Sequence, residues 1–204
     1  YLSGAFFADL LVWYHLVWTG ESARRQQPLL AELMTKGEGY TFDDRRRLLA
    51  RMGDALRGII PRYRALAERG QVELSTTPDT HPLAPLLLDF ASAREAQPDL
   101  PLPQSHFYPG GRSRIDRHIA LARDSHAQRF GQTPSGMWPA EGAVSSAFLQ
   151  QLATQGCRWA ASSQGVLANS LRRKHADSPK SPVYRPWRIE AAPGLAVFFR
   201  DERL

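Results

Sequence analysis

The sequence predicts an α/β fold in which parallel strands alternate with outer helices. Short strand-like apolar runs alternate along the chain with segments of helical periodicity. Polar side chains come at or just after the carboxyl ends of four runs: Glu73 with His81, then Glu141, Ser162 and Asp201. A complete α/β barrel takes about 250 residues. We therefore expect these 204 residues to form roughly half of a seven- or eight-stranded barrel.

Composition indicates a globular protein with enough apolar residues for a core, because 43% of the chain is hydrophobic. The longest apolar run near the start, residues 5–18, contains Asp9 and His15 and is too short to cross a membrane. The net charge is +6, but the arginine clusters are short and no ladder of aromatic residues accompanies them. We interpret the basic residues as a solvated face and expect no nucleic-acid or membrane partner.

The number of cysteines indicates the cellular compartment and limits the kinds of metal site that the chain can form. The lone Cys157 permits no internal disulfide and no cysteine-cluster zinc site, and we expect it to be a small core residue. No export signal is recognisable. Together these features predict a cytoplasmic protein.

The first strongly periodic element covers residues 41–69. Thr41 and Asp44 resemble a capping box, Pro61 should kink the helix, and Gly70 should end it. The period then changes to that of a strand over residues 71–76, which is followed by a polar turn that holds Asp79 and His81.

The remaining elements repeat the order of strand, turn and helix. We expect helical structure in part of 83–95 and over 113–130, 144–155 and 166–171, and strands over 136–138, 157–162 and 195–199. Residues 98–103 are rich in proline, residues 108–111 form a turn, and residues 169–181 read as a charged loop.

The stretch of residues 136–145 (GMWPAEGAVS) is the strongest candidate for a site. Trp138 precedes a proline and is pushed toward extended geometry, and Gly142 releases the backbone directly after Glu141. Glu141 therefore lies at a strand-to-helix turn, where α/β folds carry their chemistry. An acidic residue also suits the start of a helix, so this stretch by itself leaves both interpretations open.

Three motifs together carry a family resemblance. Residues 70–82 (GQVELSTTPDTHP), 136–145 and 198–201 (FFRD) resemble the second, third and fourth conserved regions of glycoside hydrolase family 57, in matching order and spacing. Residues 9–18 and 108–111 resemble further segments of the amylase-like branch, so the similarity covers almost the whole chain.

The resemblance implies that residues 1–204 are part of one catalytic domain, an incomplete (β/α)7-type barrel truncated at both ends. It implies a retaining enzyme that acts on α-glucans or oligosaccharides without a cofactor, either a hydrolase or a glucan transferase. Glu141 matches the nucleophile position and Asp201 the general acid/base position. His81 and Glu73 match residues that line the subsite of the cleaved sugar.

Two further residues are candidates for sugar contact. Trp138 offers a flat apolar face to a sugar ring, although a buried barrel aromatic explains it equally well. Asp79 lies beside His81 in the polar turn. Two carboxyl groups about 5 to 5.5 Å apart are what a retaining mechanism needs, and facing strand ends can supply them.

Other functions stay open. Asp79 with His81, Asp116 with His118 and Asp124 with His126 invite a metal site like that of polysaccharide deacetylases or some mannosidases. Because the latter two pairs fall on a helix, we expect no metal and interpret His118, His126 and His175 as helix or surface residues. An inactive glycan-binding barrel is a third possibility, and a basic nucleic-acid binder a fourth.

Overall fold

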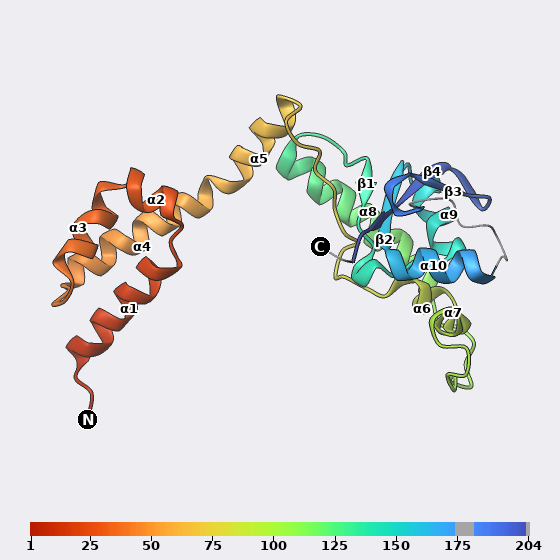
Figure 1. The fold of residues 1–204 in the computed structure, drawn as a ribbon, viewed down its shortest axis with the longest axis horizontal. Coiled ribbons are helices and arrows are strands. Elements are labelled where there is room, and N and C mark those ends of the chain that lie inside the picture. The colour runs from red at the N-terminus through yellow and green to blue at the C-terminus, as the bar shows by residue number, and fades with distance from the viewer. Residues whose placement is uncertain (174–181, 203–204) are drawn as a thin grey trace. The chain divides into compact units, whose positions relative to one another are not determined.

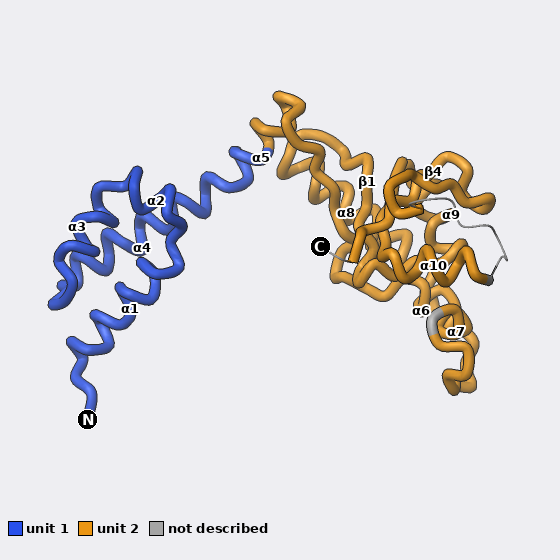
Figure 2. Tube along the Cα trace, in the orientation of Figure 1, with its two compact units in different colours: residues 1–63 blue, residues 64–204 orange. Residues whose placement is uncertain are grey.

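The computed structural model describes residues 1–173 and 182–202 of the chain (Figure 1). The chain divides into two compact units, residues 1–63 and residues 64–204 (Figure 2). The first is helical, and the second combines helices with a small sheet. The assignment of both units to one catalytic barrel stays a prediction.

The first unit is built from helices α1 (Gly4–Trp18), α2 (Glu21–Gln26), α3 (Pro28–Lys36) and α4 (Phe42–Arg57). Their inner faces and Tyr40, from the connection between α3 and α4, form one core. Its members are Val12, Leu16, Leu30, Leu33, Tyr40 and Leu48. The predicted capping box is confirmed, because Asp44 N–H donates to Thr41 Oγ1 while Asp44 Oδ2 accepts from Thr41 N–H. None of the helices in the described part of the chain has the length and apolar character needed to span a bilayer.

The long helix predicted over residues 41–69 is two helices, α4 and α5 (Ile59–Glu68). The predicted kink at Pro61 was wrong, since the break falls at Gly58. Pro61 lies in the first turn of α5, where its missing N–H leaves no helical bond unmade. Gly70 follows the end of α5 with a φ of 67°, as expected of a helix-terminating glycine.

The second unit holds a sheet of β1 (Gly136–Met137), β2 (Trp159–Ser163), β3 (Trp187–Ile189) and β4 (Ala192–Arg200). The strand order is β1-β2-β4-β3, with β1, β2 and β4 mutually parallel and β3 antiparallel to β4. The predicted parallel strands are confirmed. The sheet is mixed and not wholly parallel as predicted, because β3 and β4 form an antiparallel hairpin. Over the described residues the sheet is open, with β1 and β3 at its two ends.

The strand predicted over residues 71–76 contributes one bridge. Thr76 pairs in parallel with Met137, because Thr76 N–H donates to Gly136 O and Trp138 N–H donates to Thr76 O. Residues 71–75 form no ladder with a named strand. The bridge is enough to place the polar turn of residues 77–82 next to the end of β1.

Helices of the second unit are α6 (Ala84–Leu88), α7 (Ala93–Ala96), α8 (Gly111–Phe130), α9 (Ser146–Thr154) and α10 (Gln164–Arg173), with 3-10 turns at Phe90–Ser92, Ala140–Gly142 and Pro182–Tyr184. Helices α6, α8 and α9 bury their apolar stripes with the sheet in one core. Its members include Ile115, Ile119, Met137, Phe148, Leu152, Ala160, Leu195 and Val197. The predicted loop over 169–181 is helical up to Arg173, and 174–181 lie outside the described residues.

Cys157 lies in this core, as the sequence predicts. Burial raises the pKa of its thiol. A raised pKa keeps the thiol protonated, which fits a packing role.

Candidate active site

Three parallel strands deliver their carboxyl ends to one edge of the sheet. β2 and β4 stay in register to Ser163 and Arg200, and β1 leaves the ladder after Met137. The Thr76 bridge adds the 77–82 turn on the outer side of β1. The edge therefore carries, in order, this turn, the Glu141 turn, the end of β2 and Asp201.

Glu141 projects from a turn that is otherwise buried. Among residues 139–142 it is the one exposed residue, and 77% of its side chain is accessible. Its backbone is left-handed, with φ 54° and ψ 17°, and Gly142 follows with φ 67°. A left-handed conformation at a residue other than glycine costs on the order of 1–3 kcal/mol and recurs at functional sites. The carboxylate is thus held out of the turn by a backbone that few residues adopt.

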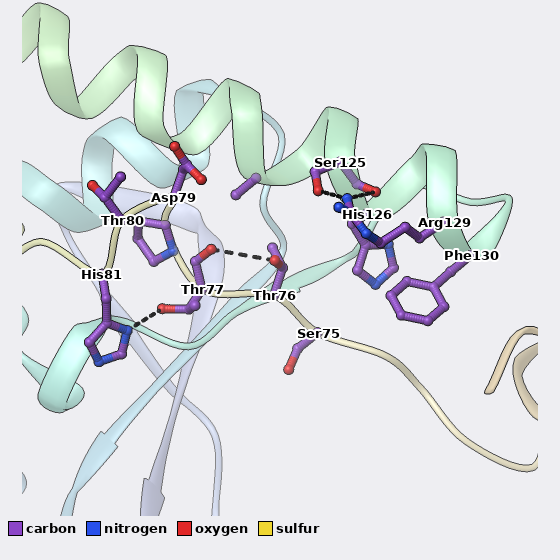
Figure 3. A pocket seen from close by; sticks show the side chains of 12 residues that line it. Ser75, Thr76, Thr77, Asp79, Thr80, His81, Ser125, His126, Arg129 and Phe130 are labelled. Atoms are coloured by element: carbon purple, nitrogen blue, oxygen red, sulfur yellow. Dashed lines mark hydrogen bonds between the residues drawn. The ribbon is translucent and has the colours of Figure 1, made fainter. Parts of the chain in front are cut away.

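His81 lies across from Glu141. Its Nε2 is 3.6 Å from Glu141 Oε1, an ion pair when the imidazole is protonated. Its Nδ1 lies 3.3 Å from Thr77 Oγ1. A dashed line marks this contact in Figure 3. Thr80 and His81 both have left-handed backbones, with φ of 60° and 54°. The two strand ends therefore bring together an acid and an imidazole from tightly turned, strained segments.

Asp201 directly follows β4 at the same edge. The hydroxyl of Tyr184, from the 3-10 turn before β3, donates to Asp201 Oδ2. This contact orients the carboxyl group and ties the end of β4 to the chain segment that precedes the hairpin.

The other predicted contact residues are more scattered. Trp138 is half-buried, and its backbone N–H donates to Thr76 O at 2.7 Å. Glu73 accepts a 2.7 Å hydrogen bond from Trp159 Nε1, and Trp159 opens β2. The Glu73 carboxylate is therefore bonded to the side chain of the first residue of β2. Its contact with a sugar stays a prediction.

Asp79 is exposed in the 77–82 turn, and its backbone N–H donates to His118 O at 3.1 Å. Together with His81 it lines an open cavity of about 400 Å³ between residues 75–81 and the second half of α8 (Figure 3). The cavity wall also includes His126 and Arg129. An open hollow thus adjoins the turn that carries His81.

Residues that could have formed the alternative metal site contact other polar groups instead. His118 Nδ1 lies 3.1 Å from Thr80 Oγ1, and Asp116 Oδ1 accepts from the side-chain amides of Gln151 and Gln155. His126 is buried on α8, with Nδ1 2.9 Å from Gln132 O. Across residues 1–173 and 182–202, no three side chains of His, Cys, Asp or Glu gather closely enough to hold a metal ion. His175 lies outside the described residues.

Comparison with known proteins identifies the family of the chain. Residues 13–204 match glycosyl hydrolase family 57. The chain belongs to this family. No similarity to a curated protein was found.

Two solved structures share the fold of the chain. The α-amylase AmyC of Thermotoga maritima superposes with a TM-score of 0.54 and 18% identity, over 96% of this chain and 31% of its own. A family 57 branching enzyme of Pyrococcus horikoshii superposes with a TM-score of 0.53 and 16% sequence identity. This match covers 96% of this chain and 33% of the branching enzyme. The chain therefore spans about a third of the length of these structures.

Several contacts at the edge were not predicted from the family 57 motifs. Thr77 and Tyr184 contact His81 and Asp201 directly. Ser162, predicted as a polar group at the edge, is fully buried and donates to Gly142 O. The spacing of Thr77 and His81 in one turn could have indicated their pairing, whereas the Tyr184 contact joins residues that only the β3–β4 hairpin brings close.

Proposed function

We propose that this chain is part of the catalytic domain of a retaining enzyme that acts on α-glucans, with Glu141 as nucleophile and Asp201 as general acid/base. The observation that carries the proposal is the exposed Glu141 carboxylate, held by a strained, buried turn and paired with His81. Membership of family 57 and the similarity to an α-amylase and a branching enzyme support an α-glucan substrate.

Strand geometry is compatible with the two-carboxyl mechanism. β1 and β4 flank β2, so their backbones are about 10 Å apart at strand spacings of about 4.8 Å. If the side chains of Glu141 and Asp201 point toward each other over the end of β2, the distance between their carboxyl groups can shorten to the separation of about 5 to 5.5 Å that retention requires. That approach of Glu141 and Asp201 is part of the proposal.

The chemistry follows from the two carboxyl groups. Asp201, protonated, would donate its proton to the glycosidic oxygen while a Glu141 oxygen bonds to the anomeric carbon, and the C–O bond to the leaving sugar breaks. Asp201, now a carboxylate, would then take a proton from water or from a sugar hydroxyl. The resulting nucleophile attacks the anomeric carbon and releases Glu141. Water gives hydrolysis, and a sugar gives transfer.

His81 would bind the sugar and orient it beside Glu141. Its Nε2 faces the Glu141 carboxylate, so the imidazole can contact a sugar hydroxyl at the same place. Trp138, Asp79 and Glu73 are proposed as further sugar contacts, with Trp138 supplying an apolar face.

A covalent adduct tests the nucleophile directly. The full-length gene product is incubated with a slow, activated fluoroglycoside, and the labelled peptide is identified by mass spectrometry. We expect one glycosyl group on the peptide that contains Glu141, and neither adduct nor turnover in Glu141→Gln. Glu190→Gln, in the exposed β3–β4 turn, is the matched control and should react normally. An adduct on another carboxylate, or normal turnover by Glu141→Gln, would contradict the proposal.

A further inference from the structure

Ser162 lies beneath the turn that carries Glu141. It belongs to β2, is 0% exposed, and its Oγ donates to Gly142 O at 2.6 Å. The ladder between β1 and β2 ends at the pair of Met137 and Ala160. Beyond that pair, the chain from β1 crosses the end of β2 without ladder bonds to it, and the Ser162 hydroxyl makes the connection.

The turn needs such a connection because Glu141, a residue other than glycine, has a left-handed backbone with a φ of 54°. Conformations of this kind persist only where the surroundings hold them. Gly142 is in contact with Ser162, since a Cβ at this position would lie at the ordinary van der Waals distance of 3.7 Å from both Cα and Oγ of Ser162. A change at Ser162 is therefore transmitted directly to the residue that follows Glu141.

We propose that Ser162 is a positioning residue for Glu141: its buried hydroxyl fixes the Gly142 carbonyl and so aims the Glu141 carboxylate at the anomeric carbon. This inference rests on the proposed role of Glu141. Ser162 is fully buried and bonded to the backbone, so it contacts no substrate. Without the hydroxyl, the Gly142 carbonyl loses its partner and the turn can relax.

The test is Ser162→Ala in the full-length gene product, assayed on an α-glucan well below the unfolding temperature. A nucleophile displaced by about 1 Å loses on the order of a hundredfold in rate. We expect kcat to fall about ten- to a hundredfold while KM changes less than about threefold, because substrate contacts are kept. The rate of glycosyl-enzyme formation should fall in parallel with kcat.

Two variants make the result specific. Ser163→Ala is the matched control, since Ser163 is the next residue of β2 and its Oγ accepts from Val166 N–H at the start of α10. It should keep the parent kcat. Ser162→Cys, which retains a weaker donor of similar shape, should give an intermediate kcat, and it replaces Ser162→Ala if that variant does not fold.

The inference is overturned if a folded Ser162→Ala, or Ser162→Cys in its place, keeps kcat within about twofold of the parent. It is also overturned if Ser163→Ala loses as much. A lower unfolding temperature with unchanged kcat would assign the hydroxyl to stability alone. Glu141→Gln separates the two proposals, because residual turnover in that variant refutes the role of Glu141 itself.

Discussion

At the scale of single residues, the candidate site depends on backbone conformation as much as on side-chain chemistry. Glu141 and His81 both occupy left-handed backbone regions that are rare outside glycine, and both have exposed side chains. An exposed ion pair of this kind contributes little to folding, about 0 to 1 kcal/mol. The stability that this pair contributes therefore does not account for the backbone strain, which the proposed role of Glu141 and His81 in sugar binding and catalysis would explain.

Asp201→Asn should separate the acid/base role from that of the nucleophile. The variant cannot protonate the leaving group, a contribution of about a hundredfold to ten-thousandfold. We expect turnover of α-glucans to collapse while activated aryl glycosides, whose leaving groups need no proton, are still cleaved in part. Steady-state kinetics on both substrate types check this, with Asp124→Asn on the exposed face of α8 as control. Equal losses on both substrates would remove Asp201 from the acid/base role.

His81→Ala can be compared with the Glu141 and Asp201 variants, because His81 lies at the same edge of the sheet. It removes a group that contacts Glu141 but takes part in no bond that forms or breaks. We expect a smaller loss of kcat/KM than either carboxyl variant suffers. A loss as complete as that of Glu141→Gln would indicate that the imidazole is itself essential to the chemistry.

At the scale of elements, the sequence predicts those with strong periodicity and clear end signals. Helices α8 and α9 and strands β2 and β4 appear within a few residues of the predicted bounds. The break between α4 and α5 was misplaced because Pro61 in a first turn is harmless while Gly58 ends α4. β3 is three residues long and defined by its pairing with β4, so no local pattern marks it.

The Tyr108-Pro-Gly-Gly motif gives an element-scale prediction. Gly110 has a φ of 70°, and a Cβ on Gly111 would lie 1.7 Å from the Leu87 carbonyl oxygen of α6. Because that oxygen belongs to the backbone, α6 and α8 would have to move apart. Gly111→Ala should lower the free energy of unfolding by at least about 1–3 kcal/mol, the range for overpacked sites.

Chemical denaturation followed by circular dichroism measures the Gly111 effect. Gly194→Ala is the matched control, because no atom lies within 4 Å of the added carbon. If the two variants are equally stable, then the close approach of α6 to α8 is not a constraint on the fold.

The capping box of α4 gives a pH prediction. Hydrogen bonds from Lys36 and then from Thr41 lower the pKa of Asp44 to about 2 from an ordinary 3.8. A carboxyl whose pKa is lowered by folding stabilises the protein above the unfolded pKa, and that stabilisation is lost as the pH falls through the folded pKa. The contribution of Asp44 should therefore be complete above about pH 4 and disappear as the pH approaches about 2.

Asp44→Asn isolates this contribution, since other carboxyl groups titrate in the same range. Denaturant unfolding at a series of pH values should show the variant less stable near neutral pH and the difference from the parent shrinking in acid. Asp43→Asn, an exposed neighbour paired with Arg46, should show a much smaller difference. A gap that stays constant down to about pH 2 would refute the assignment.

At the scale of the molecule, the sequence predicts which residues share an edge but not how far the sheet extends. Parallel strands that end in Glu141 and Asp201 follow from local patterns, because every parallel strand delivers its carboxyl end to the same side. Whether the sheet closes into a barrel depends on pairings between strands, which local sequence patterns do not encode. Residues 71–76 are an example, because their alternation is typical of a strand but only Thr76 forms a bridge.

Independence from metal ions is the prediction that concerns the whole enzyme. Both proposed catalytic groups are carboxyls that act on the sugar directly, so no step needs a Lewis acid. The full-length gene product should keep its turnover of α-glucans after dialysis against a chelator, within the scatter of an untreated sample. Asp79→Asn should likewise leave the response to chelator unchanged, since Asp79 is proposed to contact sugar. If chelation abolishes turnover and a divalent ion restores it, Asp79 and His81 become candidate ligands, and the two-carboxyl mechanism gives way to a metal-dependent deacetylase or mannosidase reaction.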